Sequence, residues 1–203
     1  MAGSPDVANT SEETKGERTR RRLLETAVER FGAQGFRATS VSEIAREVGV
    51  TQTAVYAYFP SKEALFDAAV DHDAAEVIAR AGAQASGFPA NQLVPVVLLG
   101  LLAELDAHPL AQRVVSGREP DALARLVDLP ALGTLRAFIA SEVAAAQRRG
   151  EVRADIDPEA FADGAETLLL SLVISVSQVG SSTVTRRQLG VIGIFDAALR
   201  PSG

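Results

Sequence analysis

A short stretch of the sequence concentrates side chains that could contact nucleic acid. It holds an amide, a hydroxyl and the chain's only two tyrosines, at positions Gln52, Thr53, Tyr56 and Tyr58. Amides and hydroxyls can hydrogen-bond to base edges, and phenols can reach phosphates. Lys62 follows at the expected start of another helix, where a cation is unfavourable unless an anion such as phosphate binds beside it. These residue types indicate contacts with both the bases and the backbone of DNA.

Two short helices are expected to position these side chains. Ser40 followed by Glu43 predicts a capping box at the start of the first helix. Gly49 is expected to end that helix, because glycine adopts the left-handed conformation without a steric penalty. Thr51 is then expected to cap a second helix of about two turns, which ends before Pro60. The apolar face of the first helix is expected to contain Val41, Ile44, Ala45 and Val48.

This spacing predicts a helix-turn-helix motif over residues 39–58, with the second helix as the recognition helix. The same pattern of alanine, glycine and apolar residues recurs by chance in other helical proteins. The second helix, however, buries too little apolar surface to be explained by core packing. Ser61 is expected to cap a third helix whose first turn holds Lys62, and this placement favours DNA binding over the alternative.

The segment GFRATSVSEIAREVGVTQTAVYAYFPSKEALF resembles the DNA-binding domain of the TetR family of bacterial transcriptional regulators. The block VYAYF followed by SKE carries much of the resemblance. Thr53 stands where the family frequently has glycine or proline, and Pro60 follows the aromatic Phe59. We expect these departures to affect which bases are read. The resemblance implies a homodimer that binds double-stranded operator DNA, with an effector cavity among the helices of a C-terminal region.

We predict separate roles for the residues of the motif. The side chains expected to face base edges are those of Gln52, Thr53 and Ala57. The groups expected to hold phosphates are those of Ser40, Thr51, Tyr56, Tyr58 and Lys62. Thr39, at the start of the motif, is also assigned to the DNA-binding surface. The run of arginines Arg18, Arg20, Arg21 and Arg22 fits either a solvated face or an additional phosphate contact, and the sequence leaves both open.

The charge distribution supports this placement of the DNA-binding surface. The chain of 203 residues has a net charge of −6, but residues 15–62 hold nine basic and five acidic residues, a net charge of +4. Residues 63–203 hold eleven basic and eighteen acidic residues. A basic part on an acidic body is typical of a DNA-binding protein. The absence of cysteine excludes disulfides and thiolate metal sites.

The sequence predicts an all-α protein in two parts. Residues 1–14 are polar and acidic and are expected to form a disordered tail, followed by a helix-turn-helix domain over 15–62 and a helical effector-binding and dimerisation domain over 63–203. A helix from Ser61 to about Arg80 is expected to join them. The segment Asn91 to Ala107 is apolar on nearly every side, which predicts a helix buried all round.

The chain is expected to act in the cytoplasm. The longest apolar runs, Leu93 to Ala103 and Leu168 to Val176, are shorter than the roughly 18 to 20 residues needed to span a bilayer. The N-terminus lacks a basic start followed by an apolar segment, so no secretory signal is expected.

An enzyme is the main alternative from another functional class, and its candidate residues are weak. The two histidines are His72 and His108, and neither belongs to a recognisable metal or nucleophile motif. Asp71, His72 and Asp73 are adjacent, so a helix would point them in different directions. His108 precedes a proline at a helix end, where histidine commonly acts as a polar cap. We therefore expect no catalytic residues, no metal and no cofactor.

In the last two predicted helices, the apolar face is wider than packing against one side of a core requires. Small residues beside this face would let helices approach closely, as in a four-helix interface between two copies. The alternative is that both helices are wholly internal. The residues expected at the dimer interface are Leu168, Leu172, Val176, Ile192 and Phe195.

The residues expected to line an effector cavity are Leu98, Leu102, Phe138, Ile139 and Leu169; a solid core is the alternative. Because the helix from Ser61 to Arg80 joins both parts, it is expected to be the only element that transmits a change from the cavity to the DNA. These features predict a transcriptional regulator, expected to be a repressor that a small lipophilic effector releases from a palindromic operator. The alternatives are a small-molecule sensor acting as an activator and one with weak architectural DNA binding.

Overall fold

The structure is a computed structural model that describes residues 14–179 and 185–200. The side chains of residues 185–189, 192 and 196 lie outside this description. Every regular element in the described residues is a helix, so the predicted all-α fold is confirmed there. The tail predicted over residues 1–14 lies outside the described residues, with the exception of Thr14.

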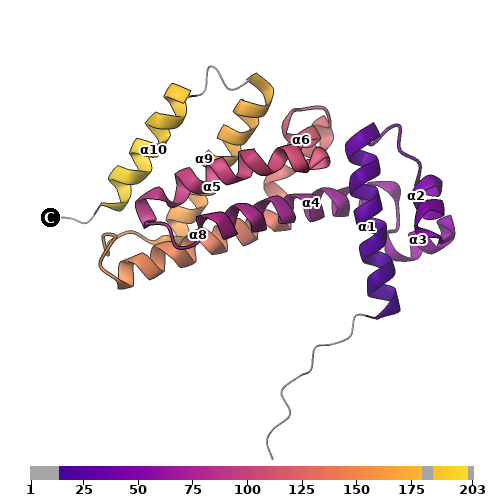
Figure 1. Cartoon of the computed structure of the whole chain (residues 1–203), viewed down its shortest axis with the longest axis horizontal. Helices are drawn as coiled ribbons and strands as arrows, with labels where there is room; N and C mark the ends of the chain where they lie inside the picture. Colours follow the sequence, from indigo (N-terminus) through magenta and orange to yellow (C-terminus); the bar gives the residue numbers. More distant parts are fainter. Residues whose placement is uncertain (1–13, 180–184, 201–203) are drawn as a thin grey trace, which may run out of the picture.

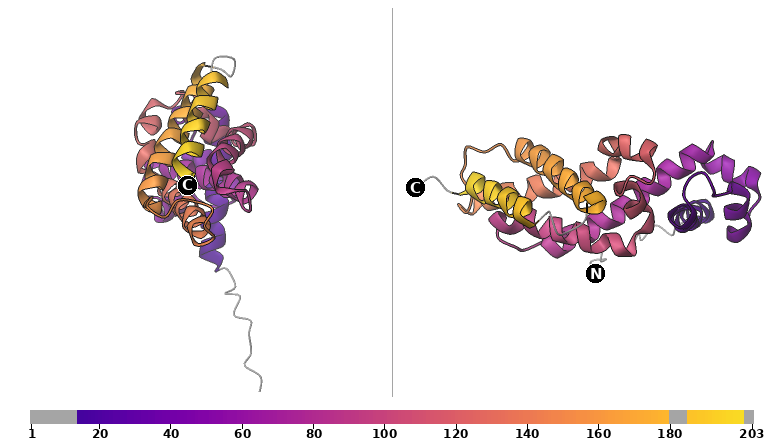
Figure 2. Two further views of the ribbon diagram at one scale, coloured as in Figure 1. Left: turned by 90° about the vertical axis from the view of Figure 1, so that its left-hand side faces the viewer. Right: turned by 90° about the horizontal axis from the view of Figure 1, so that it is seen from above.

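Three helices form a head at one end of an elongated molecule (Figure 1). They are α1 (Lys15–Gln34), α2 (Val41–Val48) and α3 (Gln52–Tyr58). The long helix α4 (Lys62–Ala85) begins in the head and continues into the body. The view from above in Figure 2 shows the head at one end of the long axis and the C-terminal helix at the other.

In the part of the chain that the structure describes, the body contains six further α-helices. They are α5 (Ala90–Glu104), α6 (Pro109–Val115), α7 (Pro120–Ala124), α8 (Pro130–Arg148), α9 (Pro158–Val179) and α10 (Thr185–Leu199). Two single-turn 3-10 helices, Leu105–Ala107 and Leu126–Asp128, follow α5 and α7. Helices α4, α5 and α8 run along the long axis and pack against one another, and α9 packs on α8. The C-terminal part of α4 thus becomes a central wall of the body.

Most of the predicted helix ends in the head are confirmed. Gly49 follows α2 in the left-handed conformation, with φ 81° and ψ 31°. The Thr51 hydroxyl oxygen accepts a hydrogen bond from the Ala54 N–H at 3.2 Å, and that of Ser61 accepts one from the Ala64 N–H at 3.1 Å. Each bond satisfies an N–H group that the first turn of a helix leaves without an internal partner.

The capping box predicted at Ser40 is wrong. Ser40 precedes α2, but its hydroxyl makes no bond to the helix backbone and instead lies 2.7 Å from the Ser42 hydroxyl. A capping box is present at α1, where the Thr14 hydroxyl accepts from the Glu17 N–H and the Glu17 carboxylate accepts from the Thr14 N–H. Helix α1 therefore begins at Lys15, with Glu17 in its first turn.

The head and the body share one continuous apolar core. Phe66 of α4 packs edge to face on Phe31 of α1, with 5.0 Å between ring centroids, and lies 5.0 Å from Phe36. Helix α1 also approaches α6 closely at Gly32. A Cβ atom there would lie 3.0 Å from the Leu110 backbone nitrogen, so only glycine fits without displacing α6. The head is thus held by α6 as well as by α4.

Helix α5 is less buried than predicted. Leu93, Val97 and Leu98 are buried, but Leu99 is 65% exposed.

Two helical segments of the described chain, Ala90–Ala107 and Pro158–Val179, are long and apolar enough to cross a membrane by length and composition. Both extend beyond the short apolar runs seen in the sequence. Core helices of soluble proteins pass the same test, so this finding is weak evidence.

Candidate nucleic-acid interface and body cavity

Helix α3 presents a polar face on the surface of the head. Val55 is fully buried and fixes the inner side of the helix, whereas Gln52, Thr53 and Ala57 are exposed. Tyr56 is 40% exposed, and its hydroxyl lies 3.3 Å from the Gln52 amide nitrogen, which donates to it. The groups predicted to face base edges therefore lie together on one accessible face.

The other residues assigned to the DNA-binding surface are exposed or half-buried, with one exception. Thr51 is exposed, and because its oxygen accepts from the backbone, its O–H remains free to donate. The Lys62 ammonium lies over the Phe36 ring, 4.6 Å from the centroid, and 3.5 Å from the Arg37 carbonyl oxygen. Ser40 and Tyr58 are half-buried. These contacts hold the Lys62 side chain at the surface of the head.

Thr39 is the exception, and its assignment to the DNA-binding surface is wrong. The residue is only 3% exposed. Its hydroxyl lies 2.8 Å from the Gly35 carbonyl oxygen and 3.2 Å from that of Arg30, and it donates to these groups. Thr39 therefore stabilises the turn between α1 and α2 and does not reach the surface.

One arginine of the basic run packs beside α3. The Arg20 guanidinium lies over the Phe59 ring, 5.0 Å from the centroid, which brings the N-terminal part of α1 next to the end of α3. Cation–π contacts of this kind leave most of the guanidinium N–H groups available to another partner. Arg30, by contrast, pairs with Glu47 of α2 at 2.7 Å and stabilises the head itself.

A small apolar pocket lies between α4, α5, α6, α8 and α9, and we call it the body cavity. Its volume is about 70 Å³. Of the five residues predicted to line it, only Leu169 does so. Leu98 and Ile139 are buried elsewhere in the core, and Leu102 and Phe138 are half-buried. The lining residues are Ala74, Val77, Ile78, Leu101, Leu105, Ala111, Val115, Leu132, Leu135, Glu166, Leu169, Leu170 and Val173.

The other four residues do not border this cavity, because apolar periodicity shows which face of a helix is buried, and not which buried side chains border a gap. Phe138, for example, packs against α4 at Gly82, where a Cβ atom would lie 3.7 Å from its ring. Glu166 was missed altogether. An acidic residue within the apolar stripe that contains Leu169 and Val173 was the signal that could have identified it.

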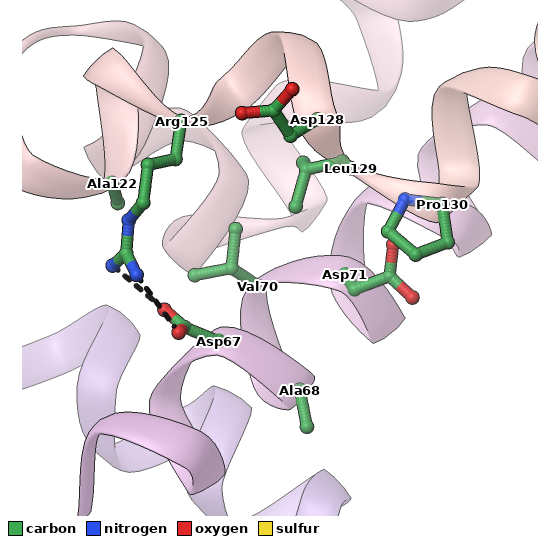
Figure 3. A pocket seen from close by; sticks show the side chains of 9 residues that line it. All are labelled: Asp67, Ala68, Val70, Asp71, Ala122, Arg125, Asp128, Leu129 and Pro130. Atoms are coloured by element: carbon green, nitrogen blue, oxygen red, sulfur yellow. Dashed lines mark hydrogen bonds and ion pairs between the residues drawn. The ribbon is translucent and has the colours of Figure 1, made fainter.

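A larger hollow on the surface lies between α4 and the segment that leads into α8 (Figure 3). Two of its three carboxylates have partners within the protein. Arg125 donates two hydrogen bonds to Asp67, at 3.0 and 2.9 Å, and Asp71 accepts from the Ala131 N–H at 2.9 Å. These contacts fasten α4 to the α7–α8 segment.

Asp73 and His108 form a buried pair that the sequence did not predict. They are 3% and 4% exposed, and His108 Nδ1 lies 2.7 Å from Asp73 Oδ1. The other Asp73 oxygen accepts from the Ala111 N–H at 2.8 Å. The expectation that the His108 side chain caps a helix end is wrong, because it joins α4 to the start of α6. No group of three or more potential ligands in the described residues could hold a metal ion.

A second polar link joins the body directly to the head. Glu119, which precedes α7, accepts a hydrogen bond from the Phe36 N–H at 3.1 Å and one from Arg113 Nε at 2.7 Å through the same oxygen. Phe36 lies in the turn between α1 and α2. Together with the contact between Gly32 and α6, this link shows that α4 is not the only connection between the head and the body, contrary to the expectation from the sequence.

The residues predicted at a dimer interface lie in different environments in the structure, from partly exposed to buried. Leu168 is 36% exposed, and Leu172 and Val176 are half-buried on the same helix. Phe195 is 5% exposed and packs edge to face on Phe161, 5.5 Å away, so assigning it to the interface is wrong. The side chain of Ile192 lies outside the description. Among the large apolar side chains that the structure describes on α9 and α10, the most exposed are those of Val179, at 66%, and Ile194, at 61%.

Comparison with known proteins gives a family match in the head. The model of "Bacterial regulatory proteins, tetR family" matches residues 23–69. The uncharacterized HTH-type transcriptional regulator YdgC of Bacillus subtilis is 47% identical over 53 residues, which are 26% of this chain and 27% of YdgC. The match thus spans about a quarter of that relative's length.

Two further comparisons extend into the body. The HTH-type transcriptional regulator UidR of Escherichia coli is 27% identical over 148 residues, which cover 71% of this chain and 74% of UidR. A crystal structure of the transcriptional regulator FadR from Bacillus subtilis in complex with stearoyl-CoA superposes with a TM-score of 0.63 and 16% identity, and covers 89% of this chain and 99% of that one. At this identity the likeness shows a shared fold.

Proposed function

Because the chain belongs to the TetR family of DNA-binding transcriptional regulators, we propose that it is a homodimeric cytoplasmic repressor. In this proposal a small lipophilic effector releases it from a palindromic operator. The observation that carries the proposal is the exposed polar face of α3, flanked by Lys62 and the basic start of α1. A helix of two turns reads only a few base pairs, so two copies related by a twofold axis would read an inverted repeat.

The contacts divide into base readout and phosphate binding. Gln52, Thr53 and Ala57 meet base edges in the major groove. The phosphate contacts come from Ser40, Thr51, Tyr56, Tyr58 and Lys62, and Arg20 extends them along the backbone. The fixed position of Lys62 over Phe36 supports this role, because a lysine held in place loses less side-chain entropy when a phosphate binds.

Substitutions at Gln52 and Lys62 should have different effects on DNA binding. We expect Gln52→Ala to lower affinity for the selected operator by about 1–3 kcal/mol and to relax the preference at the base pair it contacts. Lys62→Gln should weaken all duplexes about equally and make the plot of log affinity against log salt shallower by about one unit.

The operator for these measurements comes from selecting genomic fragments with the purified protein, and fluorescence anisotropy over a range of salt concentrations gives the affinities. Arg149→Gln serves as the control, because Arg149 is exposed at the end of α8 and pairs with Glu151. A uniform loss for both Gln52→Ala and Lys62→Gln would contradict the assignment of separate roles.

Effector release follows from the position of the body cavity. Two of its walls are α4, through Ala74, Val77 and Ile78, and α6, through Ala111 and Val115. Both helices also contact the head. A ligand that enlarges the cavity would displace these helices and change the spacing of the two recognition helices. DNA affinity would fall by the ratio of the ligand's affinities for the two states, and operator DNA would weaken ligand binding by the same factor.

The link through Glu119 provides a test of this coupling. We expect Glu119→Gln to lower operator affinity by about tenfold, because the charged acceptor for the Phe36 N–H is lost and the head is held less firmly. Amide hydrogen exchange at Phe36 should become faster in the same variant. Glu151→Gln is the matched control, since Glu151 pairs with Arg149 in the body at 2.8 Å. Unchanged exchange at Phe36 would show that this link does not position the head.

A further inference from the structure

We propose that Gln178, in the last turn of α9, is a positioning residue for DNA binding. Its side chain holds the segment 116–119 between α6 and α7, which we call the α6–α7 loop, and this loop in turn holds the turn between α1 and α2. The inference deepens the proposed function, because it connects the head to the helix that is proposed to carry the dimer interface. Helix α6 makes this connection possible, since it packs on both α1 and α9 (Figure 1).

The first contact of this path joins α9 to the end of α6. The Gln178 side-chain amide donates a hydrogen bond to the Val115 carbonyl oxygen at 3.1 Å. The amide nitrogen also lies against the loop, because a Cβ atom at Gly117 would be 3.4 Å from it. The last carbonyl groups of a helix have no partner within the helix itself. Gln178 therefore supplies, from another helix, a donor for the last turn of α6.

The α6–α7 loop is held in one conformation by its own hydrogen bonds. Gly117 has φ 79°, and its N–H donates to the Val114 carbonyl oxygen at 2.9 Å. The Arg118 N–H donates to the Arg113 carbonyl oxygen at 3.1 Å, which completes a bonding pattern common at helix C-termini. These two bonds occupy the carbonyl groups of Arg113 and Val114, and the α9 amide occupies the next one, that of Val115. The loop is thus fixed both to α6 and to α9.

Glu119, at the end of this loop, is directed toward the head. It stands immediately before α7, where a carboxylate commonly accepts a hydrogen bond from the first turn of the helix. The Glu119 side chain makes no such cap in the structure. Its Oε1 atom accepts instead from the Phe36 N–H and from Arg113 Nε. A Cβ atom at Gly35 would collide with the Arg113 guanidinium, so this ion pair packs directly on the turn between α1 and α2.

Phe36 connects the path to a predicted phosphate contact. The Lys62 ammonium lies over the Phe36 ring. The same turn also leads into α2, because the Thr39 hydroxyl donates to the Gly35 carbonyl oxygen at 2.8 Å and α2 begins two residues after Thr39. A displacement of Phe36 therefore moves Lys62 and the start of α2 together. Loss of the Gln178 bond should loosen the loop and, through it, weaken operator binding.

The first test replaces Gln178 with methionine, which has a similar length and cannot donate a hydrogen bond. Exchange of the Phe36 N–H, followed by NMR on the full-length, DNA-free protein, should become about two- to tenfold faster, as expected for the loss of one neutral hydrogen bond. Gln147→Met is the matched control, because the Gln147 amide donates to the Arg153 and Ile156 carbonyl oxygens, outside this path. It should leave the exchange of the Phe36 N–H unchanged.

A double-mutant cycle tests whether Gln178 acts through Glu119. Gln178→Met alone should weaken operator binding by about threefold. In a Glu119→Ala background the same substitution should weaken it by less than about 1.5-fold, because the loop then has no carboxylate with which to hold the Phe36 N–H. Independent contributions would instead multiply.

The outcomes separate this inference from the proposed function. Unchanged exchange at Phe36 in Gln178→Met, an equal increase in Gln147→Met, or independent effects of Gln178→Met and Glu119→Ala would overturn it. Every contact of the path lies within one subunit, so the exchange measurement requires neither a dimer nor DNA. Faster exchange at Phe36 in a protein that proves to be monomeric, or that no effector releases from its operator, would support the path and contradict the proposed function.

Discussion

The Ile194→Glu variant is expected to be a monomer that binds operator DNA at least about a hundredfold more weakly than the wild type. Ile194 lies on α10, one of the two helices predicted to form the dimer interface, and is 61% exposed. We place it in that interface, so a glutamate there should leave the subunit folded while burying a charge between the two copies. Two linked heads bind one palindrome with an avidity that exceeds single-head binding by about 10²–10⁴. Loss of the dimer removes that gain.

Sedimentation velocity and fluorescence anisotropy with the selected operator would measure both effects. Val127→Glu is the matched control, because Val127 is 63% exposed and lies in the 3-10 helix after α7. It should remain dimeric with unchanged affinity. An Ile194→Glu protein that stays dimeric would place the interface elsewhere, and a monomer with full operator affinity would contradict the need for two copies.

Removal of the buried carboxylate at Asp73 should lower the free energy of unfolding more than any other single change considered for this protein. We expect Asp73→Ala to cost about 3–5 kcal/mol, because it leaves His108 and the Ala111 N–H buried without their partner. Urea denaturation followed by circular dichroism gives the value. Because the pair joins α4 to α6, the loss should also loosen the walls of the body cavity.

Asp67→Ala is the control for this measurement. Asp67 makes a two-pronged ion pair with Arg125, but its side chain is 46% exposed, so its removal should cost less than about 1 kcal/mol. The double variant Asp73→Leu with His108→Leu should recover part of the lost stability, since no imidazole is then buried without its partner and only the Ala111 N–H lacks an acceptor. Equal costs for Asp73→Ala and Asp67→Ala would show that burial does not set the contribution of Asp73.

The sequence was sufficient to predict where α3, the proposed recognition helix, begins and ends, because these positions depend on local interactions. Gly49, Thr51 and Ser61 each act on the backbone within a few residues, and the structure places all three as predicted. The polar face of α3 follows from helical periodicity once Val55 is known to point inward. The capping box at Ser40 failed because the Ser42 hydroxyl competes for the same side chain, which the Ser-x-x-Glu pattern does not reveal.

In the body, the sequence did not predict which buried residues lie next to one another. Leu98 and Ile139 were predicted to line the cavity, and Phe195 was predicted at the dimer interface. The structure buries all three in the packed core, so none lies in the cavity wall or on an exposed surface. Which buried side chains border a gap depends on the crossing of α4, α5, α6, α8 and α9. Thr39 was misplaced for a similar reason, since its burial depends on how α1 meets the turn that leads into α2.

The sequence by itself determined the helical class, the ends of the recognition helix and the residues on its exposed face. Caps, turns and periodicity act over a few residues, and their physical causes can be read in the chain. Only the tertiary structure decided that Asp73 meets His108, that Glu119 holds the Phe36 N–H, and that Gln178 meets the Val115 carbonyl group. These contacts join residues 35, 83 and 63 positions apart, so they depend on how distant helices pack. The energies that select such arrangements arise from burial and from hydrogen bonds that exist only after the helices have packed.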